Sequence, residues 1–209
     1  KNKNIKELNG TPLIAYSIKH ALRSKLIEEI YVTSDSQKIL EVAHKYNAKK
    51  ILRPQELAND FIHPEPAIIH ALIKIAKTKK FLPECTVFLQ PTSPIRDISK
   101  LDQSILDVFS GKFNTSMAAT KTHHFIWEKN QNGEWEPPYG NLRPRRQDFH
   151  QVKETGSFFS FNTLKFLEKG DRIIKPVNLQ ITSEIESYEI DTLVDWDIIE
   201  ALVKSKSSK

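Results

Sequence analysis

Residues 85–90 read Cys-Thr-Val-Phe-Leu-Gln, a nearly continuous apolar run that ends in an amide, and residues 91–96 follow as Pro-Thr-Ser-Pro-Ile-Arg. A short run that is apolar at almost every position is typical of a strand buried on both faces, as in a parallel sheet covered by helices. The prolines end the strand in a fixed turn. This stretch predicts the centre of an α/β sheet with polar groups at its carboxyl end.

Helical and strand patterns alternate on both sides of this central strand. Apolar residues at helical spacing follow Pro12, and the segment from Glu29 to Ser34 is rich in β-branched and aromatic residues. Further helices are expected at residues 39–46, 66–78, 99–109 and 194–203, and further strands at 50–52, 115–120, 157–162, 173–179 and 187–190. We therefore expect one domain over residues 1–209, with a three-layer, doubly wound α/β fold and a mostly parallel sheet.

The composition narrows the class of protein. With 39% hydrophobic and 27% charged residues, the 209-residue chain is in the ordinary globular range. The net charge of +5 comes from basic residues interspersed with acids, which suits an anionic substrate as well as a nucleic acid. No apolar run is long enough to cross a bilayer. We expect a cytoplasmic protein without a nucleic-acid or membrane partner, in which the single Cys85 is a structural thiol.

The regular alternation stops in residues 123–155, which are rich in Trp, Pro, Gly, Asn and Arg. A long irregular segment inside a domain is usually functional, an oligomerisation arm, or both. Its cluster of Arg143, Arg145 and Arg146 suits either an anionic ligand or acids across a dimer interface. The adjacent His123 and His124 point oppositely on a strand and lack further ligands at metal-binding spacing, so we expect them to be structural.

Polar residues that directly follow strands are the first candidates for a site, because ligands of open parallel sheets bind beyond the carboxyl ends of the strands. Residues 33–35 follow one strand, and Gln90 with Arg96 follows the central one. A fixed amide and an Arg pointing out of the turn would suit an oxygen-rich anion. A surface ion pair of Arg96 is the alternative.

Two carboxylates near the end of the chain are candidates for a metal site. Glu189 and Asp191 would share one side of a strand, since alternate residues share a face, and such a pair can hold Mg²⁺ against phosphate oxygens. Asp191 could instead cap the helix expected from Val194, with Asp195 and Asp197 in its first turn.

Several segments, in this order, resemble the motifs of the acylneuraminate cytidylyltransferase family. The most specific is Leu-Gln-Pro-Thr-Ser-Pro-Ile-Arg at residues 89–96. The others lie at residues 3–13, 52–60, 123–124, 145–147, 156–161 and 188–195. The chain begins Lys-Asn-Lys-Asn without Met and goes at once into the end of the family's first motif. We therefore expect that a first strand and a phosphate-binding loop precede it in the natural protein.

The resemblance implies a nucleotide-diphospho-sugar transferase-like fold that transfers CMP from CTP to a nine-carbon 2-keto-3-deoxy acid sugar. It also implies a requirement for Mg²⁺ and a homodimer formed through the irregular segment. By position, it implies catalytic roles for Lys3 and Asp191, nucleotide binding by Lys3, Asn4 and Arg53, sugar binding by Gln90, Arg96, Arg146 and Lys153, and metal binding by Asp191 and Glu189.

Departures from the family pattern bear on the substrate. Glu189 stands where Asp is typical, which makes Asp191 the firmer metal ligand. Residues 61–66 and 153–155 also differ from segments near the sugar, so we expect legionaminic acid or another nonulosonate in place of N-acetylneuraminic acid. The alternatives are the sister family that activates an eight-carbon 3-deoxy-octulosonate, and a non-catalytic paralogue that binds a nucleotide.

Overall fold

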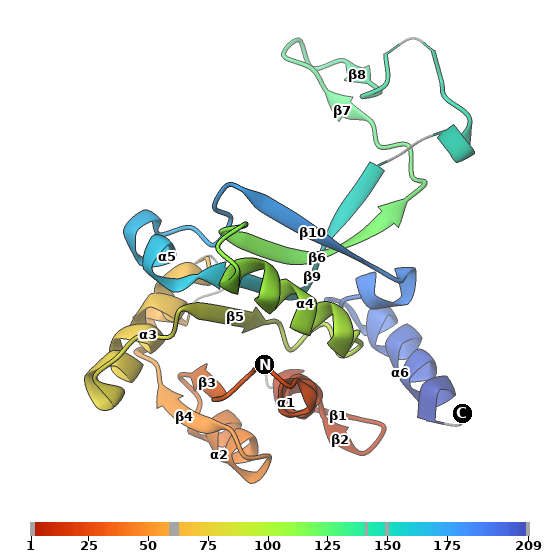
Figure 1. Ribbon diagram of the computed structural model, residues 1–209. Helices are drawn as coiled ribbons and strands as arrows, with labels where there is room; N and C mark the ends of the chain where they lie inside the picture. Colours follow the sequence, from red (N-terminus) through yellow and green to blue (C-terminus); the bar gives the residue numbers. More distant parts are fainter. Residues whose placement is uncertain (1–2, 59–62, 141, 149–150, 208–209) are drawn as a thin grey trace.

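The computed structural model describes residues 3–58, 63–140, 142–148 and 151–207, without the side chains of Arg146, Lys206 and Ser207. Its main sheet has the strand order β10-β6-β9-β5 (Figure 1). These strands are β5 (Cys85–Leu89), β6 (Thr115–Thr122), β9 (Gln151–Asn162) and β10 (Val177–Thr182). A separate parallel pair consists of β3 (Tyr31–Ser34) and β4 (Lys49–Leu52).

The helices of the described residues are α1 (Leu13–Arg23), α2 (Gln37–Lys45), α3 (Glu65–Lys79), α4 (Ile98–Phe109), α5 (Thr163–Lys169) and α6 (Leu193–Ser207). Of these, α3 and α5 pack on one face of the main sheet and α4 packs on the other, whereas α2 packs on the β3–β4 pair. Short 3₁₀ helices occupy η1 (Lys3–Ile5), η2 (Gln55–Leu57), η3 (Arg146–Asp148) and η4 (Glu184–Ser187), and β1 (Glu7–Leu8) pairs with β2 (Thr11–Pro12). Among the described residues, none of these helices combines the length and apolarity that a membrane span needs.

The alternation of side chains along β9 places the core on its two faces. Phe159 and Phe161 pack with Leu72 of α3 and Phe166 of α5. Phe158, which directly precedes Phe159 in sequence, packs on the other face with Leu101 of α4. All six side chains are almost completely buried. The α/β fold expected from the sequence is thus confirmed, with one helical layer on each face of a central sheet.

The main sheet is mixed: β5, β6 and β10 run in the same direction, as expected for a mostly parallel sheet, and β9 runs against them. β6 and β10 are parallel, but β9 runs antiparallel to both β5 and β6. A parallel connection between neighbouring strands needs a crossover, usually a helix. The chain between β6 and β9 has no crossover helix among its described residues and returns through the irregular segment, so β9 comes back antiparallel.

The strand expected at residues 187–190 is not formed. Residues 184–187 are the 3₁₀ helix η4, and the chain then runs without regular structure to α6. The backbone N–H of Ile190 donates to the carbonyl of Thr92 at 2.9 Å, which ties this segment to the turn after β5. The strand expected at 173–179 begins four residues later, at Val177.

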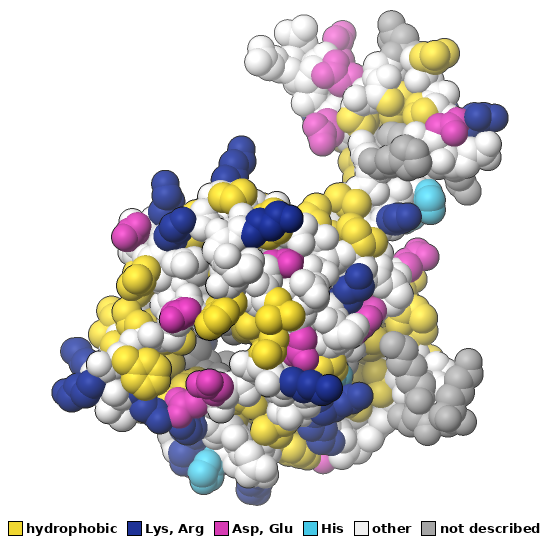
Figure 2. All heavy atoms as spheres, viewed as in Figure 1, with side chains coloured by type: hydrophobic (Ala, Val, Ile, Leu, Met, Phe, Trp, Pro, Cys, Tyr) yellow, Lys and Arg dark blue, Asp and Glu magenta, His cyan; other side chains and the backbone are white. Residues whose placement is uncertain are grey.

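The irregular segment forms an arm that projects from the body of the molecule as a separate lobe (Figure 2). Its regular part is the two-residue strand pair of β7 (Glu128–Lys129) and β8 (Trp135–Glu136). The arm leaves the body at the end of β6 and rejoins it at the start of β9 (Figure 1). It therefore stands at the same end of the sheet as the carboxyl ends of β6 and β5.

Candidate active site

Two segments that are far apart in the sequence, one at Lys3 and one at residues 190–191, meet at the candidate site. Lys3, in η1, donates from its ammonium group to the carbonyl of Ile190 at 2.6 Å. The same ammonium group lies 3.6 Å from a carboxylate oxygen of Asp191, whose side chain is 74% exposed. Asn4 follows Lys3 in the same turn and is partly buried. The fold thus brings together a cation and an accessible carboxylate, which come from predicted motifs far apart in sequence.

The cap of α6 is made by Thr192 and Asp195, so the alternative role of Asp191 as a helix cap is not realised. The hydroxyl of Thr192 accepts from the backbone N–H of Asp195 at 3.2 Å. In return, the Asp195 carboxylate accepts from the backbone N–H of Thr192 at 2.7 Å and from that of Asp191 at 3.0 Å. These hydrogen bonds lower the pKa of Asp195. The backbone of Asp191 is therefore held while its carboxylate is left open.

Arg96 points into the protein, which corrects both expectations for its direction. Only 7% of the residue is exposed, and its guanidinium donates to the carbonyl of Ser157 at 2.7 Å and to the hydroxyl of Ser17 at 2.9 Å. It also donates to the carbonyl of Gln90. Burial lowers its pKa to about 9, while the carboxylates of Glu189 and Glu186 act in the opposite direction. Arg96 therefore holds the turn through the carbonyl of Gln90.

Glu189 and Gln90 converge on Gly156, in the middle of β9. The backbone N–H of Gly156 donates to Oε1 of Glu189 at 2.6 Å. A Cβ atom added at Gly156 would lie 2.9 Å from that oxygen and 1.9 Å from Oε1 of Gln90. Glycine is therefore required here by the close approach of two side chains, a role that glycine often has inside strands.

Arg53 lies at the end of β4, apart from this group. It forms a long ion pair of 3.9 Å with Asp35, which follows β3. The Nε atom of Arg53 is buried without a hydrogen-bond partner among the described residues. Residues that follow two neighbouring strands thus meet, and the Arg53 side chain retains an unused donor.

Lys153 lines a small hollow of about 190 Å³ at the root of the arm, together with His123, His124 and Glu184. Both histidines are exposed and do not pack in the core, which corrects the expectation that they are structural. The third predicted cation of this region, Arg146, begins η3, and its side chain lies outside the described part of the molecule.

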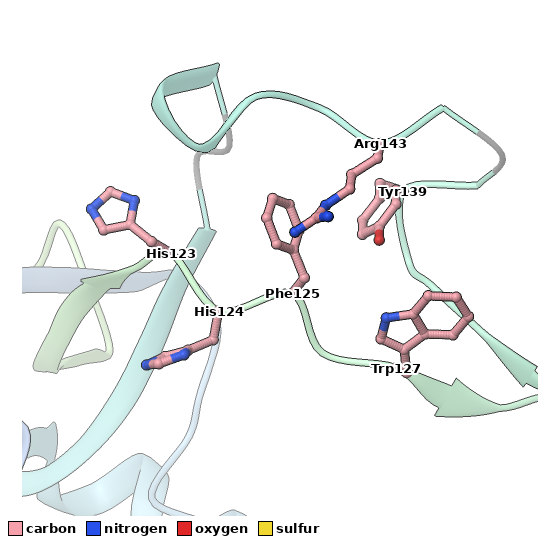
Figure 3. Close-up of a pocket in the computed structure, with 6 residues that line it drawn as sticks. All are labelled: His123, His124, Phe125, Trp127, Tyr139 and Arg143. Atoms are coloured by element: carbon pink, nitrogen blue, oxygen red, sulfur yellow. The ribbon is translucent and has the colours of Figure 1, made fainter.

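A second hollow, of about 380 Å³, lies within the arm and is bordered by aromatic groups. Figure 3 shows Phe125, Tyr139, Trp127 and Arg143 turned towards one another, while the histidines point to different sides. The Phe125 and Tyr139 rings meet edge to face at 5.3 Å between centroids, and the Arg143 guanidinium lies 4.6 Å from the Phe125 ring. The chain between β6 and β9 is thus ordered locally by its own aromatic residues.

Three contributors to the site were not identified from the sequence. Ser17 looked like one more position of the α1 stripe, Thr92 acts through its backbone carbonyl, and Gly156 was taken only as part of a strand motif. A glycine that interrupts an apolar strand could have pointed to a close approach. Nothing in the residue type of Ser17 or Thr92 gives such a signal.

The fold and the polar strand ends define the class of protein. The solved structure of CMP:2-keto-3-deoxy-manno-octonic acid synthetase complexed with CTP matches with a TM-score of 0.71, covering 98% of this chain and 92% of that one, at 11% identity. At this identity the likeness shows a shared fold.

Sequence comparisons identify the family. The family model described as Cytidylyltransferase matches residues 1–131. Pseudaminic acid cytidylyltransferase of Campylobacter jejuni is 29% identical over 210 residues, or 97% of this chain and 89% of that protein. CMP-N,N'-diacetyllegionaminic acid synthase of the same species is 30% identical over 212 residues, or 99% of this chain and 90% of that protein. The chain belongs to the cytidylyltransferase family.

Proposed function

We propose that this protein transfers CMP from CTP to the anomeric hydroxyl of a nine-carbon 2-keto-3-deoxy acid sugar and releases pyrophosphate. The observation that carries the proposal is the meeting of Lys3 and Asp191, 3.6 Å apart, beside the turn that bears Gln90. Family membership and the names of the relatives support it. We also propose that the reaction takes place in the cytoplasm.

In the proposed reaction, the sugar oxygen attacks the α-phosphorus of CTP. A bond from this oxygen to phosphorus forms while the bond from phosphorus to the bridging oxygen breaks, pyrophosphate leaves, and the hydroxyl proton passes to solvent. Because the negative charge on the phosphates shifts during this exchange, the Lys3 ammonium group would stabilise the transition state electrostatically. Lys3, Asn4 and Arg53 would bind the nucleotide, and the unused Nε donor of Arg53 fits that role.

Mg²⁺ is proposed as the cofactor, with Asp191 as its protein ligand. Mg²⁺ is usually held by one or two carboxylates together with substrate phosphates and water. The open carboxylate of Asp191 on an anchored backbone fits this pattern. Among the described residues, no cluster of three His, Cys, Asp or Glu side chains could bind a metal without the substrate. When bound, the metal would supply positive charge at the phosphates.

The sugar would lie between Gln90 and the root of the arm. Gln90 presents an amide at the end of β5, and Lys153 with Arg146 would supply cations for the acidic sugar, although the described residues place only Lys153. Arg96 would contribute indirectly, by holding the carbonyl of Gln90. We propose a legionaminic acid or another nonulosonate as the preferred sugar.

Two features of the whole protein complete the proposal. A strand upstream of Lys1, with a phosphate-binding loop after it, would complete the sheet. In the described chain, β3 and β5 each have a ladder partner on one side only.

The arm would join two copies of the chain into a homodimer. Its side chains of Trp127 and Trp135 are 51% and 64% exposed.

The test is pyrophosphate release by the full-length protein with CTP, Mg²⁺ and a panel of acid sugars. The panel contains N-acetylneuraminic, legionaminic, pseudaminic and 3-deoxy-octulosonic acids. We expect release with a nine-carbon acid, and the highest kcat/KM with a sugar other than N-acetylneuraminic acid. Release with the eight-carbon acid alone would support the sister activity. A folded protein that releases pyrophosphate with none of them would contradict the transferase function.

A further inference from the structure

Glu189 differs from Asp191 in the direction of its carboxylate, although the two residues are only two positions apart. The Asp191 carboxylate is largely exposed and lies beside Lys3. The Glu189 carboxylate instead reaches the backbone N–H of Gly156 at 2.6 Å, against the middle of β9. The two acids therefore contact different parts of the protein. One faces the N-terminal segment, and the other faces the sheet.

The place that Glu189 reaches is shared with Gln90. Both side chains lie so close to the α-carbon of Gly156 that a methyl group there would meet Oε1 of Gln90 at 1.9 Å and Oε1 of Glu189 at 2.9 Å. The end of the Gln90 amide that lies against Gly156 is its oxygen, beside the Glu189 carboxylate. The carboxylate, held by the Gly156 N–H, occupies the neighbouring space and so limits where the Gln90 side chain can lie.

Glu189 also lies near the buried charge of Arg96. The Arg96 guanidinium donates to the carbonyls of Gln90 and Ser157, so it touches the residue before the turn and the residue after Gly156. Burial alone disfavours this cation, and the negative charge of Glu189 is the first of the two that favour it. A buried charge without a counter-charge is strongly destabilising. Glu189 therefore supports the same turn through its charge and through its hydrogen bond.

We infer that Glu189 is a positioning residue, which fixes the Gln90 amide and the Arg96-bound turn on the sugar side of the site and leaves the metal to Asp191. The inference rests on the proposed function for the meaning of the sugar side. It also gives a reason for Glu in place of Asp at this position. An Asp carboxylate would be shorter by about one carbon–carbon bond, roughly 1.5 Å, and could not keep a contact of 2.6 Å to Gly156 without a shift of the backbone.

The test compares the substitutions Glu189→Asp, Glu189→Gln and Gly156→Ala with Asp191→Asn in the full-length protein. Glu189→Asp shortens the side chain, Glu189→Gln removes its charge, and Gly156→Ala displaces the side chains of both Gln90 and Glu189. We expect each of these three to raise the KM for the sugar by about 10-fold or more, the cost of losing a charged hydrogen bond. The Mg²⁺ concentration for half-maximal activity should stay within about twofold of the wild type, whereas Asp191→Asn should raise it strongly.

A binding measurement separates the two roles without turnover. By calorimetry, the gain in CTP affinity on adding Mg²⁺ should persist in Glu189→Asp and be lost in Asp191→Asn. The matched control is Glu168→Asp, the same chemical change at an exposed site on α5, which should alter none of these values. Thermal denaturation identifies any variant that fails to fold, and Gly156→Ala tests whether the contacts at Gly156 affect the KM for the sugar when the residue at position 189 is unchanged.

A failure of the inference about Glu189 can be told apart from a failure of the proposed function. If the wild-type protein is inactive with every sugar, the proposed function fails, and the CTP and Mg²⁺ titrations still report whether Glu189 belongs to the metal site. If the wild type is active and Glu189→Asp or Glu189→Gln shifts the Mg²⁺ response as Asp191→Asn does, Glu189 is a metal ligand and the inference is overturned. An unchanged KM for the sugar in all three variants would overturn it as well.

Discussion

Arg96 shows how a charged residue can serve a site without touching a ligand. Its guanidinium satisfies acceptors on three different segments, β9, α1 and the turn after β5. Only a planar group with several donors in fixed directions can do this, which is why lysine is a poor substitute at such positions. The buried Arg96 thereby holds Gln90 in a fixed position at the end of β5.

The substitution Arg96→Lys should lower the free energy of unfolding by about 1–3 kcal/mol, because buried acceptors lose their donors. Arg96→Met should cost more, about 3–5 kcal/mol, since Glu186 and Glu189 then lose a counter-charge. Urea denaturation measures both. The control is Arg145→Met, because the Arg145 side chain is 75% exposed in its ion pair with Asp148 and should contribute little. Equal stability of the Arg96 and Arg145 variants would contradict this role.

At the residue scale, the sequence identified groups at strand ends better than it identified directions of side chains. Gln90 does follow the buried strand β5, as polar residues at the carboxyl end of a strand are expected to. Lys3 and Asp191 lie together beside the turn after that strand. The inward direction of Arg96 depends on acceptors in α1 and β9, which are distant in sequence. No local pattern encodes such contacts.

At the scale of elements, α6 holds the N-terminal segment in place. Trp196 is 5% exposed and packs in one cluster with Leu8, Leu13, Ile190 and Ile199. The ammonium group of Lys6 lies 4.1 Å from the centroid of the Trp196 ring, a cation–π contact. The last helix of the chain therefore supports both η1, with Lys3, and the residue before Asp191.

Trp196→Ala should lower the free energy of unfolding by about 3–5 kcal/mol through the cavity it leaves. Trp196→Phe keeps an aromatic ring under Lys6 and should lose much less. If the cluster positions Lys3, the affinity for CTP should fall in Trp196→Ala under conditions where the protein is still folded, and recover in Trp196→Phe. Calorimetric titration with CTP measures this. Equal affinity in the two variants would separate α6 from nucleotide binding.

Asp107 joins α4 to β6 and β10. One of its carboxylate oxygens accepts from Ser116 at 2.8 Å, from Asn178 at 2.6 Å and from Gln180 at 2.6 Å. Partial burial would raise the pKa of Asp107, but these hydrogen bonds and that of Gln103 outweigh it, and the pKa lies below its ordinary value of 3.8. The ionised carboxylate is therefore stabilised more in the folded state than in the unfolded state.

A lowered carboxyl pKa stabilises the folded protein above the unfolded pKa, and this stability is lost as the pH falls through the folded pKa. Asp107→Asn should cost about 1–3 kcal/mol at neutral pH, because donors lose a charged acceptor. The difference from the wild type should shrink as the pH falls below 3.8. Urea denaturation over this pH range measures it, with the exposed Asp197→Asn as control. A pH-independent difference would show that the carboxylate charge is not involved.

The sequence predicted the helices and the buried strands because their apolar periodicity is local. The directions of the strands were harder to predict from the sequence. β9 extends from Gln151, beyond the expected 157–162, and its antiparallel pairing follows from the route of the arm. The segment at 187–190 has a strand-like composition, yet it is fixed by hydrogen bonds to Thr92, Lys3 and Gly156, none of which belongs to a strand ladder. Such tertiary contacts override the local preference.

At the scale of the whole molecule, the arm is the part least supported by the rest of the chain. Its β7 and β8 strands are two residues each, and a two-stranded hairpin is at best marginally stable in water. Its surface carries exposed apolar groups, including Trp135 at 64% and Leu142 at 86%. An arm of this kind is expected to gain stability by packing on a second copy, because association buries its aromatic residues.

The proposed homodimer predicts that the double substitution Trp127→Ser and Trp135→Ser weakens association. Exposed tryptophans are the residues most often found as energetic centres of interfaces, so the loss should be about 2 kcal/mol or more, or at least about 30-fold in the dissociation constant. Sedimentation at several protein concentrations measures it. The control is Phe81→Ser with Phe109→Ser, two apolar residues of similar exposure on the body. If the wild type is monomeric at all concentrations, or if the control weakens the dimer as much as the arm variant, the arm is not the interface.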